Sequence, residues 1–187
     1  METALEQKAA LRKQMLVRRA ALSTAEVRSA SAAIWERLAQ VPAIDNAETF
    51  CVYVSTGTEV ETHGLIRQLL ARGREVCVPA FVQGRYVTAM IDDFDADLQP
   101  GHWGILEPRE VLPAAEPDVW LVPGVAFDRR GGRVGHGKGY FDRLLTGASG
   151  VKIGLAYEFQ VVEVVPAAAH DVRLDYIITE KQTIKGH

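Results

Sequence analysis

Residues 119–145 read VWLVPGVAFDRRGGRVGHGKGYFDRLL and contain three features in a fixed order. Residues 119–122 are an apolar run that predicts a strand, residues 131–139 hold five glycines interleaved with Arg and Lys, and residues 140–145 predict the start of a helix. Glycine lets a backbone approach phosphate oxygens closely, and free N–H groups at a helix start point toward an anion. The stretch therefore predicts an anion site between a strand and a helix.

The glycine-rich turn, defined here as residues 130–139, differs from two well-known phosphate motifs. Residues 132–138 fit G-x-x-x-x-G-K, but Gly139 stands where a Walker A loop has the Ser or Thr that holds magnesium. The spacing of its last three glycines also differs from the dinucleotide fingerprint G-x-G-x-x-G. The alternative is a flexible hairpin loop with scattered charge. The many glycines and the nearby cations favour an anion site without identifying the anion, and Asp142 adds a carboxylate suited to magnesium. The cations are Arg133, Lys138 and Arg143.

Length and composition indicate a globular protein with a single domain over residues 1–187. No apolar run approaches the length of a membrane span, and the N-terminus lacks the apolar stretch of a secretory signal. The formal net charge of -3 argues against a protein that wraps nucleic acid. We therefore expect a cytoplasmic protein without a membrane or nucleic-acid partner. The sequence leaves the oligomeric state open, and a monomer is compatible with it.

The cysteines and histidines give no metal-site spacing. Cys51 and Cys77 each lie in an apolar, strand-like run, which predicts two buried thiols in a reducing compartment and leaves a disulfide between neighbouring strands as the alternative. The histidines are widely scattered, so four ligands at zinc spacing are absent. They include His63, His102, His136 and His170.

Strands and helices alternate along the chain, which predicts an α/β fold: a three-layer, largely parallel sheet with helices on both faces. A helix over 4–22 would place Leu5, Ala9, Leu16 and Ala20 on one face. A second would begin at the capping box Ser23-x-x-Glu26 and end before Pro42, and a third would begin at the cap Thr62 and end near Arg72, before Gly73. Strands are expected over 49–55, 75–80, 86–91, 119–122, 152–156 and 176–179, with a long irregular segment over 92–118.

Two loops leave strand ends in this arrangement, the glycine-rich turn and residues 55–62. Ligands of such sheets bind beyond the carboxyl ends of the strands. We therefore expect the two loops to form one shared site.

Other motifs accompany the glycine-rich turn in a fixed order. They are Lys8-x-x-x-Arg12, the block from Tyr53 to Thr62 with Glu59 inside it, Trp103-Gly104-Ile105, residues 123–128, the run Gly139-Tyr140-Phe141-Asp142-Arg143, and residues 170–175. The ordered set resembles the 5-formyltetrahydrofolate cyclo-ligase family, also called 5,10-methenyltetrahydrofolate synthetases, over nearly the whole chain.

The resemblance implies conversion of 5-formyltetrahydrofolate to 5,10-methenyltetrahydrofolate with ATP as co-substrate and Mg²⁺ as cofactor, releasing ADP and phosphate. The formyl oxygen is a poor leaving group, and transfer of the γ-phosphoryl group onto it turns it into phosphate. N10 then attacks the formyl carbon and closes the ring. Phosphoryl transfer relies mainly on positioning and on neutralising charge, which suits a glycine-rich cradle with Lys, Arg and a metal.

The resemblance also implies a role for individual residues. Lys138 would be the main catalytic group. Asp142 and Asp175 would hold magnesium, with a helix-start acid and a strand-edge charge as the plain alternatives. ATP contacts would come from Lys8, Arg12, Arg133, Val134, Gly135, His136, Gly137, Lys138, Gly139, Tyr140 and Phe141. Folate contacts would come from Val54, Glu59, Trp103 and Tyr140, and Glu61 competes with Glu59 for that role. A polyglutamate tail, which the sequence leaves open, would have Arg67, Arg72 and Arg109 as candidate contacts.

Two positions depart from the family pattern, and two other functions stay open. His136 replaces a permanent charge found in some relatives, which suggests a pH-sensitive ATP affinity, and Phe141 lacks a hydroxyl that the family often has.

A non-catalytic nucleotide- or folate-binding paralogue is expected to have lost some of the residues named above, and all are present. An isomerase or transferase acting on phosphorylated small molecules is the other alternative, and a protein that binds ATP but no reduced folate would favour it.

Overall fold

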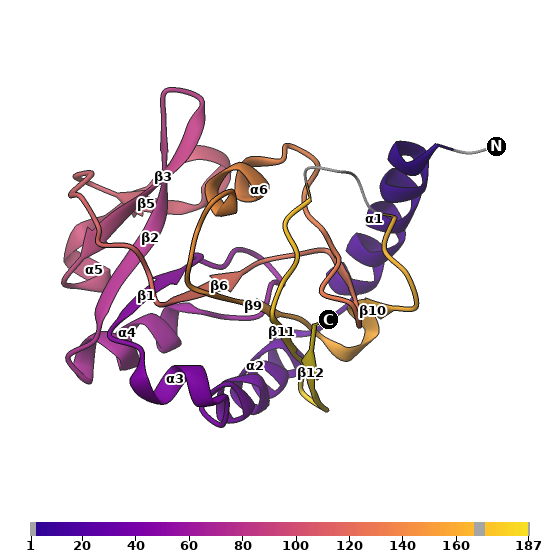
Figure 1. The fold of residues 1–187 in the computed structure, drawn as a ribbon, viewed down its shortest axis with the longest axis horizontal. Coiled ribbons are helices and arrows are strands. Elements are labelled where there is room, and N and C mark those ends of the chain that lie inside the picture. The colour runs from indigo at the N-terminus through magenta and orange to yellow at the C-terminus, as the bar shows by residue number, and fades with distance from the viewer. Residues whose placement is uncertain (1–2, 167–170, 187) are drawn as a thin grey trace.

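A seven-stranded sheet forms the centre of the computed structural model, which describes residues 3–166 and 171–186 (Figure 1). Its order is β12-β11-β9-β6-β1-β2-β3. The five strands from β11 to β2 run parallel, and β12 and β3 are antiparallel edges. The bounds are β1 Thr49–Val52, β2 Glu75–Val82, β3 Arg85–Ile91, β6 Val119–Val122, β9 Val151–Leu155, β11 Tyr176–Ile178 and β12 Thr183–Lys185.

Helices cover both faces of this sheet, which confirms the expected three-layer, largely parallel α/β fold. α2 (Thr24–Leu38) and α4 (His63–Ala71) pack on the face that carries Leu121, and α6 (Tyr140–Leu145) packs on the face that carries Val122. Successive side chains of a strand point to opposite faces, so one apolar run supplies both layers. In Figure 1, α6 lies above the strands, and α2, α4 and the short α3 (Pro42–Asn46) lie below.

α1 (Ala4–Ala20) packs on a second, three-stranded sheet of order β10-β7-β8. Met15 of α1 shares an apolar cluster with Val125 and Val134 of that sheet region. The small sheet contains the first half of the glycine-rich turn, so α1 lies against the predicted anion site. Its strands are β7 Ala126–Asp128, β8 Arg133–Val134 and β10 Val161–Val162.

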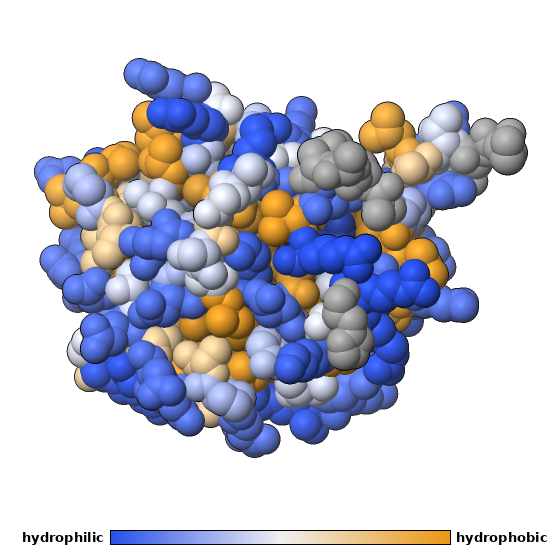
Figure 2. All heavy atoms as spheres, viewed as in Figure 1, coloured by the Kyte–Doolittle hydropathy of each residue, from blue (hydrophilic) through white to orange (hydrophobic). Residues whose placement is uncertain are grey.

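The apolar face predicted for α1 was wrong. Three of its four residues are exposed and the fourth is half-buried: Leu5, Ala9 and Ala20, then Leu16. Hydrophobic atoms show at the outer end of α1 in Figure 2, where Leu5 is 80% exposed. Met15 and Arg19 are buried instead. The inward face carries charged side chains at helical spacing, and a search for apolar periodicity does not find such a face.

The predicted helix starts and stops were partly right. Ser23 and Glu26 form the expected capping box of α2. The Ser23 hydroxyl and the Ser23 N–H both donate to the Glu26 carboxylate, which holds the pKa of Glu26 below its usual value. Gly73, with φ of 72°, follows the end of α4 as expected. Thr62 is not a side-chain cap, because its buried hydroxyl donates to the Tyr53 carbonyl at 2.6 Å and accepts from the Ser55 N–H.

The segment predicted to be irregular, residues 92–118, contains only short elements. They are α5 Phe94–Asp97, the hairpin of β4 Leu98–Pro100 and β5 Leu106–Pro108, and the one-turn 3-10 helix η1 His102–Gly104. The other such turn, η2 Glu158–Gln160, follows β9. The hairpin carries Trp103 in its loop, so this segment forms part of the site.

The two cysteines are free, buried thiols, as expected. Cys51 of β1 and Cys77 of β2 are direct partners in the parallel register. Burial, and the neighbouring Cys77 thiol in addition, raise the pKa of Cys51 well above its usual value.

Candidate active site

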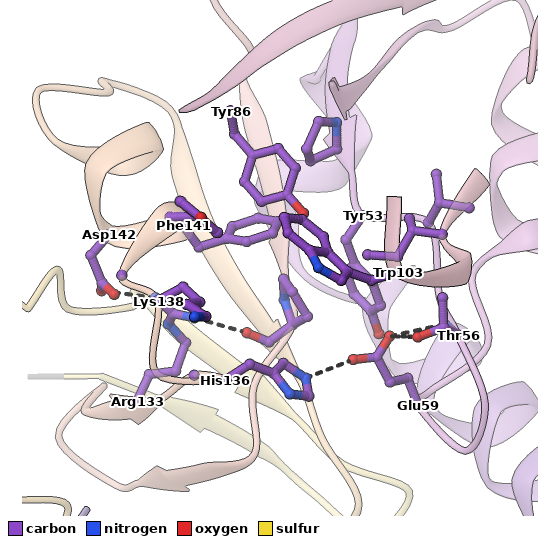
Figure 3. A pocket seen from close by; sticks show the side chains of 17 residues that line it. Tyr53, Thr56, Glu59, Tyr86, Trp103, Arg133, His136, Lys138, Phe141 and Asp142 are labelled. Carbon is purple, nitrogen blue, oxygen red and sulfur yellow. Dashed lines mark hydrogen bonds and ion pairs between the residues drawn. The ribbon is translucent and has the colours of Figure 1, made fainter. Parts of the chain in front are cut away.

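A cavity of about 370 Å³ lies at the carboxyl ends of β1 and β6, where the sequence predicted a shared site (Figure 3). Its walls come from the segment after β1, from β3 and the hairpin loop that carries Trp103, and from the glycine-rich turn with the start of α6. The lining residues are Tyr53, Val54, Thr56, Glu59, Pro79, Tyr86, Trp103, Ile105, Pro123, Arg133, Gly135, His136, Lys138, Gly139, Tyr140, Phe141 and Asp142.

Most of the site residues predicted from the sequence line this one cavity. The residues that do so are Val54, Glu59, Trp103, Arg133, Gly135, His136, Lys138, Gly139, Tyr140, Phe141 and Asp142. Val134 is buried in β8 and Gly137 lies within the turn, next to lining residues. Arg12 contacts the turn from α1, Lys8 of the same helix pairs with Asp171, and Asp175 lies elsewhere.

Glu59 is the buried carboxylate of the cavity, with a side chain that is 10% exposed. Its Oε2 accepts from the Thr56 N–H at 2.9 Å, and its Oε1 lies 3.3 Å from His136 Nε2 and 3.9 Å from an Arg19 nitrogen. Burial by itself would raise the pKa of Glu59. The His136 hydrogen bond, the Arg19 charge and the Thr56 N–H outweigh burial, so the pKa lies below its usual value and the group is ionised.

Glu59, rather than Glu61, faces the cavity. Glu61 Oε1 accepts from the Gly64 N–H at 3.0 Å in the first turn of α4, and its backbone carbonyl accepts from the Trp35 indole. Glu61 therefore caps a helix, a role that the sequence had given to Thr62. Of the two acids, Glu59 is therefore the one whose side chain lines the cavity.

The glycine-rich turn needs its glycines for conformation and for close approach. Gly139 begins α6 with φ of 63°, in the left-handed region. Gly137 has φ of 96°, and a Cβ there would meet the Arg12 guanidinium at 3.2 Å. Arg12 Nε donates to the Gly135 carbonyl at 2.8 Å, and Lys8 forms an ion pair with Asp171. α1 therefore holds the backbone of the turn from outside the cavity.

Arg133 connects the turn to the start of α6. It is 5% exposed, and its guanidinium donates to the Pro123 carbonyl at 3.1 Å and to Asp142 Oδ1 at 2.8 Å. Among the described residues, Nε of Arg133 has no hydrogen-bond partner. The contact fixes the Asp142 carboxylate at the cavity wall beside Lys138.

Trp103 lines the cavity from the loop of the β4–β5 hairpin and offers an exposed aromatic surface. It is 62% exposed and adopts φ of 56°, which is uncommon for a residue with a side chain. Its ring stacks on Tyr140 with centroids 6.0 Å apart and planes 25° from parallel, and Phe81 packs edge-on against both rings. The stack joins the hairpin loop to the start of α6, and both of its rings line the cavity.

The comparisons with known proteins identify the family of the chain. The model of the 5-formyltetrahydrofolate cyclo-ligase family matches residues 4–180, a range that includes the glycine-rich turn, Glu59 and Trp103. The chain belongs to this family. It is an enzyme family of ligases, and the resemblance seen in the sequence is confirmed.

Individual relatives match over most of their length. A probable 5-formyltetrahydrofolate cyclo-ligase of Caenorhabditis elegans is 33% identical over 201 residues, with 98% of each chain covered. The 5-formyltetrahydrofolate cyclo-ligase of Escherichia coli is 33% identical over 153 residues, 76% of this chain and 84% of the relative. An NMR structure of Aquifex aeolicus 5,10-methenyltetrahydrofolate synthetase superimposes with a TM-score of 0.85 at 35% identity, covering 95% of this chain and 92% of that one.

Asp175, the second residue predicted to hold magnesium, lies away from the cavity. This residue precedes β11 and its carboxylate accepts from the Lys152 N–H at 2.7 Å, at the amino ends of β9 and β11. The cavity lies at the opposite ends of the parallel strands, so Asp175 does not join Asp142 there. Within residues 3–166 and 171–186, no group of three or more His, Cys, Asp or Glu side chains is arranged to hold a metal ion.

Asp142 alone still fits a magnesium ion that arrives with a nucleotide. Mg²⁺ in nucleotide sites is commonly held by one or two carboxylates together with substrate phosphates and water. The Asp142 side chain is 16% exposed at the cavity wall. It therefore offers a hard oxygen ligand next to the predicted phosphate cradle.

Sequence reasoning missed Arg19, Tyr53 and Tyr86. Tyr53 and Tyr86 line the cavity, and burial raises the pKa of both hydroxyls. Arg19 lies behind Glu59. A signal for Arg19 exists, since it continues the spacing of Lys8, Arg12 and Met15 along one face of α1.

The remaining predictions concern residues away from the cavity. None of the arginines proposed for a polyglutamate tail lines the cavity: Arg67, Arg72 and Arg109. Arg67 pairs with Asp95, and Arg109 donates to the Ala96 carbonyl. His170 lies outside the described residues. Within the described part of the chain, no helix has the length and apolar character needed to cross a membrane.

Proposed function

We propose that this chain converts 5-formyltetrahydrofolate to 5,10-methenyltetrahydrofolate with ATP and magnesium, releasing ADP and phosphate. One observation carries the proposal: a single cavity joins a cationic glycine-rich turn to a buried, ionised carboxylate and an exposed Trp. The first feature suits phosphates and the second and third suit a pterin. The full-length similarity to proteins named for this reaction supports the pairing.

The reaction needs both halves of the cavity at once. The formyl oxygen attacks the γ-phosphorus, and the bond from that phosphorus to ADP breaks. N10 then attacks the formyl carbon, the bond from that carbon to the phosphorylated oxygen breaks, and phosphate leaves while N10 gives up its proton to solvent. Little covalent chemistry is left to the protein, so catalysis rests on positioning and on charge stabilisation.

The glycine-rich turn would hold the nucleotide. Lys138 would stabilise the charge that develops on the transferred phosphoryl group, since it lies on the turn and lines the cavity. Arg12 would keep the turn in place through the Gly135 carbonyl. Lys8, which pairs with Asp171 in the structure, would contact a phosphate of ATP after leaving that ion pair. Asp142 would hold magnesium, which when bound neutralises phosphate charge.

The opposite wall would hold the folate. The Glu59 carboxylate would accept two parallel hydrogen bonds from the amino and N–H edge of the pterin. Trp103 and Tyr140 would offer an aromatic surface for the ring system, and Val54 an apolar contact. Trp103, from the hairpin loop, stacks on Tyr140, which directly follows the glycine-rich turn. The folate and the nucleotide would therefore lie next to each other at Tyr140.

The test follows the near-ultraviolet absorbance of the methenyl product in a mixture of protein, 5-formyltetrahydrofolate and magnesium ATP. We expect a rise that needs both ATP and magnesium. Lys138→Ala should abolish turnover while keeping folate binding, because only the phosphoryl-stabilising charge is removed. Lys181→Ala, which removes an exposed lysine outside the cavity, is the matched control. Full activity in Lys138→Ala would refute its role, and a flat trace from folded wild-type protein would refute the proposed reaction.

A further inference from the structure

Glu59 is supported on its far side by a buried arginine from α1. Arg19 is 8% exposed, and one guanidinium nitrogen lies 3.9 Å from Glu59 Oε1. The other donates to the Gly124 carbonyl, which follows β6, at 3.5 Å. A buried guanidinium is costly without an anionic partner, so the placement of Arg19 is explained by the carboxylate that it faces.

The two cations beside Glu59 differ in their exposure. His136 is 52% exposed and lines the cavity, on the side from which a substrate would arrive. The Arg19 side chain is 9% exposed and does not line the cavity. A bound ligand could therefore displace His136 from Glu59, whereas Arg19 would keep its contact throughout.

We propose that Arg19 is a positioning residue for folate recognition: it holds the Glu59 carboxylate ionised and aimed at the pterin edge. The proposal rests on the proposed function, in which Glu59 is the pterin acceptor. α1 also carries Arg12, which holds the Gly135 carbonyl of the glycine-rich turn. One helix thus positions the folate acceptor and the nucleotide cradle relative to each other.

The charge environment of Glu59 sets the direction of the expected pH effect. Glu59 faces Arg19 from α1, His136 from the glycine-rich turn, and the hydroxyls of Tyr53 after β1 and Tyr157 after β9. Of these, Arg19 is the permanently charged cation. Its loss would raise the pKa of Glu59. As the pH falls, the carboxylate would then be protonated, and folate binding lost, at a higher pH than in the wild type.

The experiment measures the dissociation constant of 5-formyltetrahydrofolate without nucleotide from pH 3 to pH 8, a range that brackets the lowered pKa of Glu59. Arg19→Gln removes the charge, and Arg19→Lys retains it. We expect Arg19→Gln to move the midpoint of the pH profile upward by about one unit and Arg19→Lys to keep it close to the wild-type value. Arg18→Gln is the control, because Arg18 is exposed and contacts Phe159 instead.

Glu59→Gln and the double variant with Arg19→Gln separate the two proposals. If Glu59→Gln leaves folate affinity unchanged, the assigned role of Glu59 in the proposed function fails. If Glu59→Gln weakens binding but Arg19→Gln leaves the pH midpoint in place, the Arg19 proposal fails and the proposed function stands. Both proposals are supported if Arg19→Gln changes folate affinity much less in the Glu59→Gln background than in the wild type. Should Arg19→Gln not fold, a shifted midpoint in Arg19→Lys at wild-type stability would still overturn the positioning role.

Discussion

At the scale of single residues, His136 and Glu59 form a direct contact between the glycine-rich turn and the loop over residues 55–62, which were predicted to share one site. His136 was expected near phosphate, where it would make ATP affinity depend on pH. Its Nε2 lies instead 3.3 Å from a carboxylate oxygen that the pterin would need. The pH-sensitive ATP affinity remains a prediction, and the geometry adds a competition between His136 and folate.

We therefore expect His136→Ala to strengthen folate binding in the absence of nucleotide by about three- to tenfold. The reason is that the contact to Glu59 no longer has to be broken, and a net hydrogen bond contributes about 0.5–1.5 kcal/mol. The measurement is the folate dissociation constant at neutral pH. Weaker binding in the variant would mean that His136 contacts the folate directly and does not compete with it.

At the scale of elements, the turn between β8 and α6 depends on the left-handed Gly139. A Cβ in this conformation costs about 1–2 kcal/mol, so Gly139→Ala should lower stability by that amount or shift the turn. A shifted turn would misplace Lys138 and Tyr140. We expect weaker ATP binding and slower turnover, together with a smaller loss of folate affinity because Tyr140 is also a proposed folate contact, measured by titration of each ligand.

Gly147→Ala is the matched control for that substitution. Gly147 has φ of 81° just after the other end of α6, open space around its Cβ position, and no place in the cavity lining. It should lose similar stability and keep ATP affinity. Equal loss of ATP affinity in both variants would show that the effect comes from destabilised α6 and not from the shape of the turn.

The elements themselves were predictable where local chemistry decides them. The capping box at Ser23, the stop at Gly73 and the apolar run 119–122 each act through neighbouring residues, and each was found in the sequence. The inward face of α1 was not found, because its charged side chains are buried by contacts with residues that are distant in sequence. Arg12 contacts Gly135 and Arg19 contacts Glu59. Thr62 likewise looked like a cap, and its hydroxyl is used by the Tyr53 and Ser55 backbone instead.

At the scale of the whole molecule, motifs that are far apart in sequence meet because the parallel strands end on one side. This explains why most predicted site residues line one cavity and why Asp175 does not. Asp175 stands at the start of its strand, and the other motifs follow the ends of theirs. The predicted strand over 176–179 already placed Asp175 before its strand, but the magnesium role came from the resemblance and took no account of that position. Arg19 was missed because its partner Glu59 is supplied only by the fold.

The contacts that hold the Glu59 segment also predict how the molecule responds to alkaline pH. The segment that carries Glu59 is joined to the sheet by two buried tyrosines. Tyr53 donates to the Val60 carbonyl at 2.8 Å, and Tyr157 donates to the Glu59 carbonyl at 3.1 Å. Burial raises the pKa of Tyr53, and it raises the pKa of Tyr157 to about 12. Both hydroxyls must stay protonated in the folded state.

The sign of the stability change follows from this. A folded-state pKa above the unfolded value of about 10 contributes stability that is fully present below pH 10 and lost as pH rises toward 12. We expect the free energy of unfolding in urea to fall over that window. Tyr157→Phe should be less stable at pH 8 by about 1 kcal/mol, the net worth of one hydrogen bond, and should lose less stability between pH 10 and 12 than the wild type. An unchanged alkaline slope in Tyr157→Phe would show that this hydroxyl is not what ties the Glu59 segment to the sheet, and Tyr53→Phe would then be the variant in which the slope must flatten.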